Sequence, residues 1–307
     1  MAVEQSPSFQ WIEQHCPTCR TPPARYLGRR GGRAHHAGKG IECRIWQCTQ
    51  CSLIFPNPMP VPEGGAEALY NLDADDYFIN HDVAERSRLA LALLSQAESL
   101  VERKGRLLDV GVGRGELLKA AAAQGWAVLG LEPSPSFAAA ARAHAPGVDL
   151  LETDLLRADL PPGSFDVIIL QAVLEHLHDP ASVIEEVARL LAPRGVLYAD
   201  VPNELGLYAR CGNAYQRVRG RDWVVNLSPT FSPFHVFGYS VRSLRALYAS
   251  HLLEPARFVA RGGRSTLPAG TSLGARVEGA AAALVTCVAN ATGTGTYIAS
   301  WARKPTP

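Results

Sequence analysis

Short apolar runs alternate with helical stretches through the middle of this 307-residue chain, and this alternation most limits the folds open to it. Strands that are apolar on both faces and separated by helices predict a parallel sheet, because each crossover places a helix on one face of that sheet. We therefore expect an α/β fold with a doubly wound sheet. The predicted buried strands are Leu107–Val110, Ala127–Leu131, Val148–Leu151, Phe165–Leu170 and Val196–Val201.

The remaining elements are predicted from periodicity and from helix signals. A helix from about residue 83 to Lys104 has apolar residues on one face, and Gly105 suits its C-terminal cap. After the fifth strand, a stretch of about 40 residues, Pro202–Tyr239, is too long for a plain connector and rich in aromatic side chains, so we expect it to cover a substrate. The end of the chain indicates a helix, a strand, a helix and a strand, over Val241–Leu252, Pro255–Val259, Leu273–Ala289 and Thr296–Trp301.

A three-glycine turn, Gly111-Val112-Gly113-Arg114-Gly115, joins the first predicted strand to the next helix. Glycine is needed where a Cβ would block a tight turn or the close approach of a ligand to the backbone. The helix that begins near Gly115 presents free N–H groups and a positive dipole end, which favour an anionic group. At the end of the next strand, the carboxylate of Glu132 can accept hydrogen bonds from both hydroxyls of a ribose. The GxGxG spacing differs from the GxGxxG of dinucleotide binders.

With these motifs the chain resembles the class I S-adenosylmethionine (SAM) dependent methyltransferases, across roughly residues 83 to 303. The resemblance extends to Thr153-Asp154 after the third strand and to a fourth-strand motif that runs from Phe165 to His176. It implies a Rossmann-like, seven-stranded doubly wound sheet with SAM at the carboxyl ends of the strands. Asp154 would lie near the adenine amino group, and Tyr77 would close over SAM. The residues assigned to the cofactor are Asp109, Gly111, Gly113, Gly115, Glu132, Pro133, Asp154, Leu155, Gln171, Ala172, Tyr77 and His176.

Two CxxC pairs precede this region, Cys16/Cys19 and Cys48/Cys51, with 28 residues between them. Four thiolates from two such turns can hold one tetrahedral zinc ion, and His15, His35 and His36 are alternative ligands. So short a segment buries too little apolar surface to fold alone, so we expect the ion to be structural. A Pro-rich stretch near residue 60 marks the end of the module. The predicted parts are a zinc-ribbon module at 12–60, a linker with N-terminal helices at 61–104, and a SAM-dependent methyltransferase domain at 105–303 with the insert 202–239.

Thirty basic and 29 acidic residues leave a formal net charge of +1, so no overall charge draws the chain toward nucleic acid or a membrane. No apolar run of about 18 residues occurs, and Met1–Gln10 lacks the pattern of a signal peptide. A cytoplasmic location is therefore the default expectation, where CxxC pairs favour metal over disulfides. The segment between the pairs is basic and is either a phosphate-binding patch or a solvated loop; it contains Arg20, Arg25, Arg29, Arg30, Arg33, Lys39 and Arg44.

Three histidines, His176, His178 and His235, lie where a general base would be placed. A base is needed when the methyl acceptor is a hydroxyl or an acidic carbon, and histidine titrates in the useful range. His235 is the first choice, because it resembles the histidine of an HxxxFS-like segment in zinc-ribbon deoxysugar C-methyltransferases, which also carry two N-terminal CxxC pairs. Those enzymes have glutamate where this chain has Phe234, and they add a large C-terminal domain, which argues against sugar C-methylation.

Three functions fit these features. The first is methyl transfer from SAM to a small-molecule acceptor enclosed by the aromatic-rich insert, with His235 as the base and His176 as a second catalytic residue. The second is an RNA methyltransferase that holds RNA on the basic module. The third is a non-catalytic scaffold that binds SAM. The plainer roles also stay open: Glu175 and His176 would shape the methionine end of the SAM site, and His235 would only pack or cap the following helix.

Overall fold

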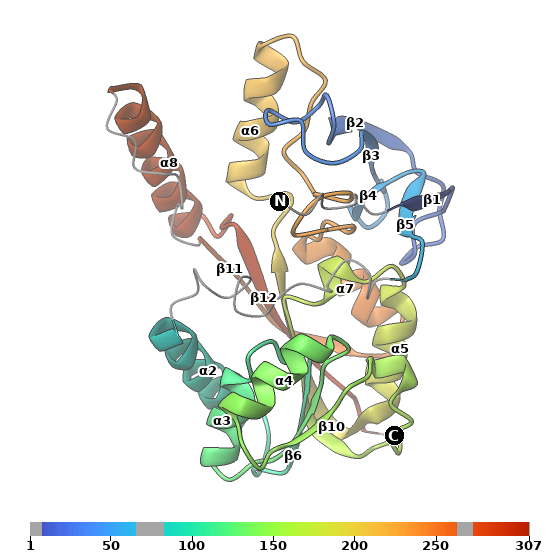
Figure 1. The fold of residues 1–307 in the computed structure, drawn as a ribbon, viewed down its shortest axis with the longest axis vertical. Coiled ribbons are helices and arrows are strands. Elements are labelled where there is room, and N and C mark those ends of the chain that lie inside the picture. The colour runs from blue at the N-terminus through green and yellow to red at the C-terminus, as the bar shows by residue number, and fades with distance from the viewer. Residues whose placement is uncertain (1–7, 66–82, 263–272, 307) are drawn as a thin grey trace.

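The computed structural model describes residues 8–65, 83–262 and 273–306. Its centre is a seven-stranded sheet with the strand order β11-β12-β10-β9-β6-β7-β8 (Figure 1). The chain leaves β6 toward β7 on one side and returns to β9 on the other, so the direction of winding reverses at β6. The parallel strands are β6 (Arg106–Val110), β7 (Ala127–Leu131), β8 (Asp149–Leu151), β9 (Phe165–Gln171) and β10 (Leu191–Pro202). β12 (Tyr297–Arg303) is antiparallel to both neighbours, β10 and β11 (Glu254–Arg261).

Alternate residues of the strands pack against different helices, as expected for a sheet covered on both faces. Val167 and Ile169 of β9 pack with α2 (Val83–Glu98) and α3 (Glu116–Ala123), whereas Ile168 and Leu170 pack with α5 (Pro180–Leu190) and α7 (Val241–Ala249). The other helical elements are α4 (Pro135–His144), η2 (Leu155–Arg157), η3 (Leu174–His176), α6 (Leu207–Val218) and α8 (Leu273–Ala291). Among the helices that the structure describes, none has the length and apolar character needed to cross a bilayer.

All the predicted strands and the doubly wound sheet are confirmed, with corrections at two boundaries. The helix predicted to reach Lys104 ends at Glu98, and Gly105 is not its cap. The Ser99 hydroxyl donates to the Gln96 carbonyl at 2.7 Å, and so competes for an acceptor that a continued helix would use. β10 begins at Leu191, five residues earlier than predicted, because Leu191 already pairs with Phe165 before a shift in register.

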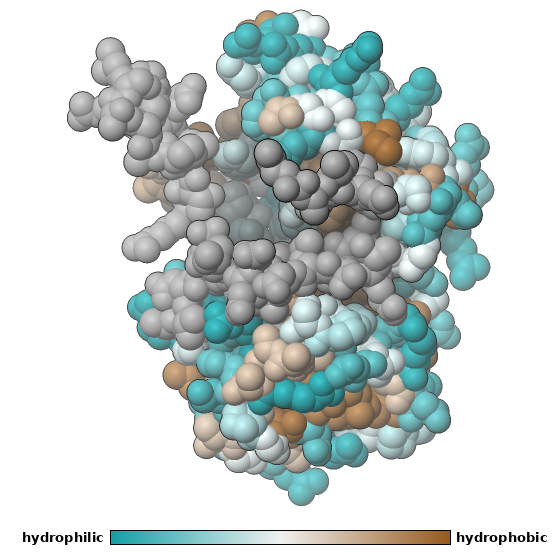
Figure 2. Space-filling model, viewed as in Figure 1, coloured by the Kyte–Doolittle hydropathy of each residue, from teal (hydrophilic) through white to brown (hydrophobic). Residues whose placement is uncertain are grey.

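A small N-terminal module lies above the main sheet (Figure 1). It consists of a three-stranded antiparallel sheet, β2 (Arg25–Arg30), β3 (Cys43–Gln47) and β4 (Ile54–Pro56), and of the pair β1 (Phe9–Ile12) and β5 (Met59–Pro62). Its outer surface is mainly hydrophilic on the face shown in Figure 2. Some of its buried residues, among them Phe55 and Met59, belong to the same apolar cluster as Phe237 and Tyr239. The module therefore shares a core with the rest of the chain, and the division into domains stays a prediction.

The insert after β10 covers both outer edges of the module sheet. Beside β2, the Arg29 N–H donates to the Asp222 carbonyl at 2.7 Å, and the Val224 N–H donates to the Arg29 carbonyl at 3.0 Å. Beside β4, Ile54 and Gly238 exchange two backbone hydrogen bonds of 2.9 and 2.8 Å. Uncovered edges would expose unpaired N–H and carbonyl groups, so this pairing both protects the module and fixes its position.

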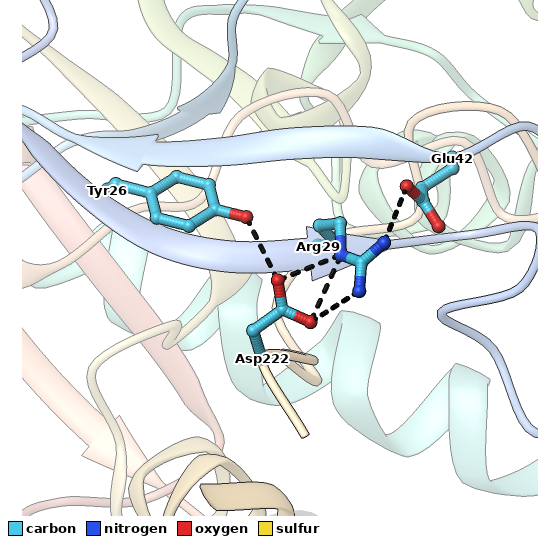
Figure 3. Close-up of polar contacts among 4 residues, drawn as sticks. All are labelled: Tyr26, Arg29, Glu42 and Asp222. Atoms are coloured by element: carbon cyan, nitrogen blue, oxygen red, sulfur yellow. Dashed lines mark hydrogen bonds and ion pairs between the residues drawn. The ribbon is translucent and has the colours of Figure 1, made fainter. Parts of the chain in front are cut away.

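Side chains reinforce the contact along β2. Figure 3 shows the Arg29 guanidinium between two carboxylates, Asp222 of the insert and Glu42 of the module. Arg29 donates to Asp222 from both Nε and Nη2, at 2.8 and 2.7 Å, and the Tyr26 hydroxyl donates to the same carboxylate at 3.5 Å. These groups are about half exposed, so their main effect is to fix the register of the insert and only slightly to stabilise it.

We expect the substitution Gly28→Ala to detach the insert from β2. Gly28 has φ 151°, and an added Cβ would clash with the Asp222 carbonyl oxygen and lie 2.9 Å from Cγ1 of Val224. The expected loss is about 1–3 kcal/mol of unfolding free energy, measured by denaturant titration. Gly38→Ala is the control, because Gly38 also has positive φ but an added Cβ meets nothing within 4 Å. Equal losses in the two variants would contradict the clash.

Candidate functional site

The predicted cofactor residues meet at the carboxyl ends of the parallel strands. Strand pairing places Val110 of β6 beside Leu131 of β7, and Leu131 beside Leu151 of β8. The turns that follow these strands and β9 therefore lie along one edge of the sheet, where its winding reverses. These turns carry Gly111, Gly113, Gly115, Glu132, Pro133, Asp154, Leu155 and Ala172, and Gln171 ends β9.

The backbone of the first turn requires its glycines. Gly111, Gly113 and Gly115 have φ of 75°, 55° and 85°, in the region that L side chains avoid. A Cβ on Gly111 would lie 2.9 Å from Cγ2 of Val173, and one on Gly115 would lie 3.3 Å from Ala141 of α4. Because Gly115 directly precedes α3, the free N–H groups of the first turn of this helix lie at the same edge of the sheet.

A buried carboxylate is fixed beside this turn. Glu132 is 5% exposed; its Oε1 accepts from the Ser134 N–H at 3.0 Å, and its Oε2 accepts from the Gly113 N–H at 3.3 Å. Burial raises the pKa of Glu132. Burial, with Glu132 and Glu116 close by, also raises the pKa of Asp109 to about 7. Oriented carboxylates in so little water suit neutral donors such as the hydroxyls of a ribose.

The other predicted cofactor residues have mixed surroundings. Asp154 accepts from the Arg157 N–H at 3.0 Å and pairs with Arg157 Nε at 2.6 Å, so its carboxylate is shared with Arg157. Leu155 is buried, whereas Pro133 and Gln171 are exposed. Ala172 has φ 53° and donates its N–H to Asp200 at 2.8 Å. Tyr77 lies outside the described residues, so its role stays a prediction.

Two of the three candidate bases come together. His176 of η3 and His235 of the insert have ring centroids 4.8 Å apart, with the rings edge to face. Burial lowers the pKa of His176 to about 4 and, with His176 beside it, that of His235 to about 3, so both rings are neutral near pH 7. His178 lies elsewhere: its Nε2 donates to the Pro60 carbonyl at 3.1 Å and joins this loop to the module.

Three acidic groups adjoin this site; sequence analysis assigned Glu175 only a part in shaping the methionine end of the SAM site and assigned no role to Asp200 or Glu204. Glu175 is 2% exposed, and burial raises its pKa to about 8. Burial also raises the pKa of Asp200 to about 6. It raises the pKa of Glu204 as well. The signal for Asp200 was available, because an acid at the end of the apolar run Val196–Val201 must lie at the same sheet edge as Glu132. No such signal exists for Glu204, which lies in irregular backbone.

A cavity of about 390 Å³ lies between the module and the insert. Its size is within the range of small-molecule sites. The module contributes Arg30, His35, His36 and Lys39, and the insert contributes Glu204, Val225, Leu227, Ser228, Phe231, Ser232, Pro233 and His235. His235 is therefore common to the cavity and to the histidine pair behind β9.

The four predicted metal ligands also come together. Their sulfur atoms all lie within 4.8 Å of one another, and Cys16 Sγ is 3.5 Å from Cys51 Sγ. Both CxxC turns have the same backbone pattern: the first cysteine accepts from the residue four positions on, Arg20 or Ser52, at 2.7 and 3.0 Å. Those two residues share the left-handed conformation, with φ of 56° and 70°. Sulfurs about 2.3 Å from a tetrahedral ion are about 3.8 Å apart, so this arrangement fits zinc.

The histidines considered as alternative ligands are not in this cluster. The basic stretch of the module is also partly engaged within the chain. Arg29 pairs with Asp222 and Glu42, and Arg30 donates from Nε to the Leu227 carbonyl at 3.0 Å and lies over the Phe231 ring. The RNA hypothesis depends on these arginines for phosphate contacts, so this engagement weakens it.

Comparison with known proteins agrees with this site. Residues 108–199 match the family described as the methyltransferase domain. Residues 108–199 thus form a methyltransferase domain of this family. Over 201 residues, 66% of this chain and 66% of the relative, the chain is 28% identical to a probable SAM-dependent methyltransferase of Mycolicibacterium smegmatis. It is 38% identical to the ubiquinone biosynthesis O-methyltransferase of Sodalis glossinidius, over 34% of this chain and 46% of that protein. The methyltransferase domain thus spans about half to two thirds of these relatives.

The fold of this methyltransferase domain is also found in solved structures. A chain of the complex between the Haloferax volcanii Trm112 methyltransferase activator and a protein described as a methyltransferase has a TM-score of 0.53. The two chains are 20% identical, and the match covers 76% of this chain and 97% of that chain. At this identity the likeness shows the fold alone, a Rossmann-like seven-stranded sheet as predicted.

Proposed function

We propose that this methyltransferase domain transfers a methyl group from SAM to a small-molecule acceptor that binds in the cavity between the module and the insert. One observation carries the proposal: His235 lines the cavity and also contacts His176, which follows β9 at the cofactor edge. The cavity is thereby joined to the edge where SAM is expected. The name of the ubiquinone biosynthesis relative is consistent with a small acceptor.

The residues of the cofactor edge fit SAM. The glycine turn adopts a backbone that L side chains avoid, and the carboxylate of Glu132 is already oriented by two backbone N–H groups. When bound there, SAM would supply a methyl group already activated on a sulfonium. The chain then mainly has to hold the acceptor in line, a positioning effect worth about 7–11 kcal/mol in favourable cases.

His235 is the proposed base for an acceptor that must lose a proton. Its neutral ring offers a lone pair at Nε2, and the cavity brings an acceptor within reach of this group. His176 would hold the neighbouring ring in place from the cofactor side. Both roles are consistent with the partial exposure of the two side chains, 20% for His235 and 18% for His176.

We also infer that Cys16, Cys19, Cys48 and Cys51 hold a structural zinc ion. The donor set, the mutual distances and the two matching turns all support it. Four thiolates fill a tetrahedral ion, so no position remains for a substrate. The ion would instead fix the module, and with it one wall of the acceptor cavity.

The first test is calorimetric titration of the zinc-replete protein with SAM. We expect binding in the micromolar range, weakened about tenfold to 100-fold in Glu132→Ala, because two hydrogen bonds to a carboxylate are lost. Glu185→Ala, an exposed acid on α5, is the control and should bind as the parent does. Binding without turnover on any acceptor would favour the scaffold hypothesis, and absence of binding would overturn the enzyme function altogether.

A further inference from the structure

Glu175 has the closest carboxylate to both catalytic histidine candidates among the described residues. Its Oε1 lies 3.9 Å from Nε2 of His176 and 4.0 Å from Nε2 of His235. The carboxylate thus comes from η3, behind β9, whereas the residue directly before His235 is the apolar Phe234. All three ligand-type atoms of this trio lie within 4.8 Å of one another.

The backbone holds the two segments of the trio together. The carbonyl of Glu175 accepts from the N–H groups of Val236 and Phe237, at 2.8 and 3.2 Å. The His176 ring donates to carbonyl groups of the segment just before His235. The Tyr239 hydroxyl adds a hydrogen bond of 3.3 Å to the carbonyl of Leu174. These contacts hold the backbone of Glu175 beside the segment that carries His235.

One oxygen of the Glu175 carboxylate is left without a hydrogen-bonding partner. Its Oε2 is buried and makes no hydrogen bond within the part of the chain that the structure describes. A buried carboxylate in this state is costly unless a cation or a donor is available. The nearest donor that catalysis would create is a protonated His235.

We infer that Glu175 is the positioning residue of the proposed methyl transfer, and that its carboxylate stabilises His235 after this ring has taken the proton of the acceptor. This inference rests on the proposed function. In the step, the bond between the acceptor atom and its proton breaks, and the lone pair of the neutral His235 ring forms the new N–H bond. Glu175 stays ionised and gains a cationic partner, and the proton later leaves to solvent through the cavity.

Charge supports this division of roles. Burial opposes a charge on His235 or Glu175 taken alone, but an ion pair inside the protein offsets part of that cost. The other groups that face the trio are Asp200 and Glu204, and His176 repels a proton on His235. Asp200 is engaged by the Ala172 N–H, and Glu204 accepts from Asn226 at 2.6 Å. Glu175 is therefore the carboxylate most available to His235.

The pH dependence has a definite sign. Glu175 acts only when it is ionised, and burial raises its pKa to about 8. Turnover should therefore rise with pH through about 8 and level off above that value. In Glu175→Gln this rise should disappear, and turnover at pH 9 should fall about tenfold or more, because the protonated histidine loses its partner.

A readout that does not require turnover separates this inference from the proposed function. In the protein without SAM, with ¹⁵N-labelled histidine, NMR titration should show the ring nitrogen shifts of His235 changing with a midpoint near pH 8 as Glu175 ionises, and this change should be absent in Glu175→Gln. Glu175→Asp keeps an ionisable carboxylate and should recover part of both this titration step and the turnover. Glu204→Gln is the matched control, a carboxylate of the same cavity whose loss should leave the step in place.

Three results would overturn the inference. A folded Glu175→Gln in which the ring nitrogens of His235 still titrate near pH 8 would show that the carboxylate does not act on the ring. The same pH profile in Glu175→Gln and the parent would show the same for catalysis. A second equivalent of zinc per chain that disappears in Glu175→Gln would show that Glu175, His176 and His235 bind a metal instead. If Glu175 affects the His235 ring but no methyl transfer is found, the interaction between the two residues stands and only the proposed function is rejected.

Discussion

Replacing His235 by alanine is expected to lower turnover about 100-fold or more, while the affinity for SAM stays within about twofold. His235 lines the acceptor cavity, whereas Glu132 and the glycine turn lie after β6 and β7. Loss of the base should therefore affect the chemical step and not cofactor binding. The measurement is single-turnover formation of S-adenosylhomocysteine with an acceptor found by screening, together with calorimetric titration of SAM.

His144→Ala is a suitable control, because His144 lies at the end of α4 and does not line the cavity. It should leave turnover near the parental value. Full activity in His235→Ala would remove this residue from the mechanism and restrict it to packing. A parallel loss of SAM affinity would indicate that the insert also supports the cofactor edge.

The second large effect is expected from Cys48→Ser. Structural zinc contributes about 10–16 kcal/mol of apparent binding energy in small modules, and a ligand set reduced to three thiolates should not retain the ion against a chelator. We expect one zinc per parental chain and none in the variant after dialysis, measured by elemental analysis. The thermal unfolding midpoint should fall as well, because Cys48 and Cys51 belong to the apolar cluster that contains Phe237.

Cys211→Ser provides the matched control, since Cys211 is exposed on α6 and should not affect the metal content. Finding no metal in freshly purified parent protein would reject the zinc site. SAM binding should decline less than acceptor binding in Cys48→Ser, because the module forms a wall of the cavity and supplies none of the predicted cofactor residues.

Local patterns predicted most of the main sheet. Apolar runs about as long as a strand, separated by helical periodicity, predicted β6 to β9 within a few residues and β10 except for its first five residues. The helix that ends at Glu98 was predicted to reach Lys104 because the apolar periodicity continues past the true end of the helix. There a single Ser99 hydroxyl competes for the backbone, an effect too local for periodicity to reveal.

The insert was predicted as a cover, but its contacts with the module were not. Asp222 and Gly238 lie in irregular backbone, and each pairs with a module strand nearly 200 residues earlier in the chain. No periodic pattern in the sequence predicts such pairing. Gly28 reflects it, because a Cβ there would clash with the Asp222 carbonyl, but this reason can be recognised only from the tertiary structure.

The sequence by itself determined the doubly wound sheet, the gathering of the predicted cofactor residues at one edge of that sheet, and the four-cysteine cluster, because each depends on residues whose spacing along the chain places them together. Only the tertiary structure decided that the Glu175 carboxylate lies 4.0 Å from the His235 ring, that Arg29 forms an ion pair with Asp222, and that a cavity is lined by both the module and the insert. These contacts join segments that are irregular and far apart in sequence. Their proximity results from how the whole chain packs, which local hydrophobic patterns do not encode.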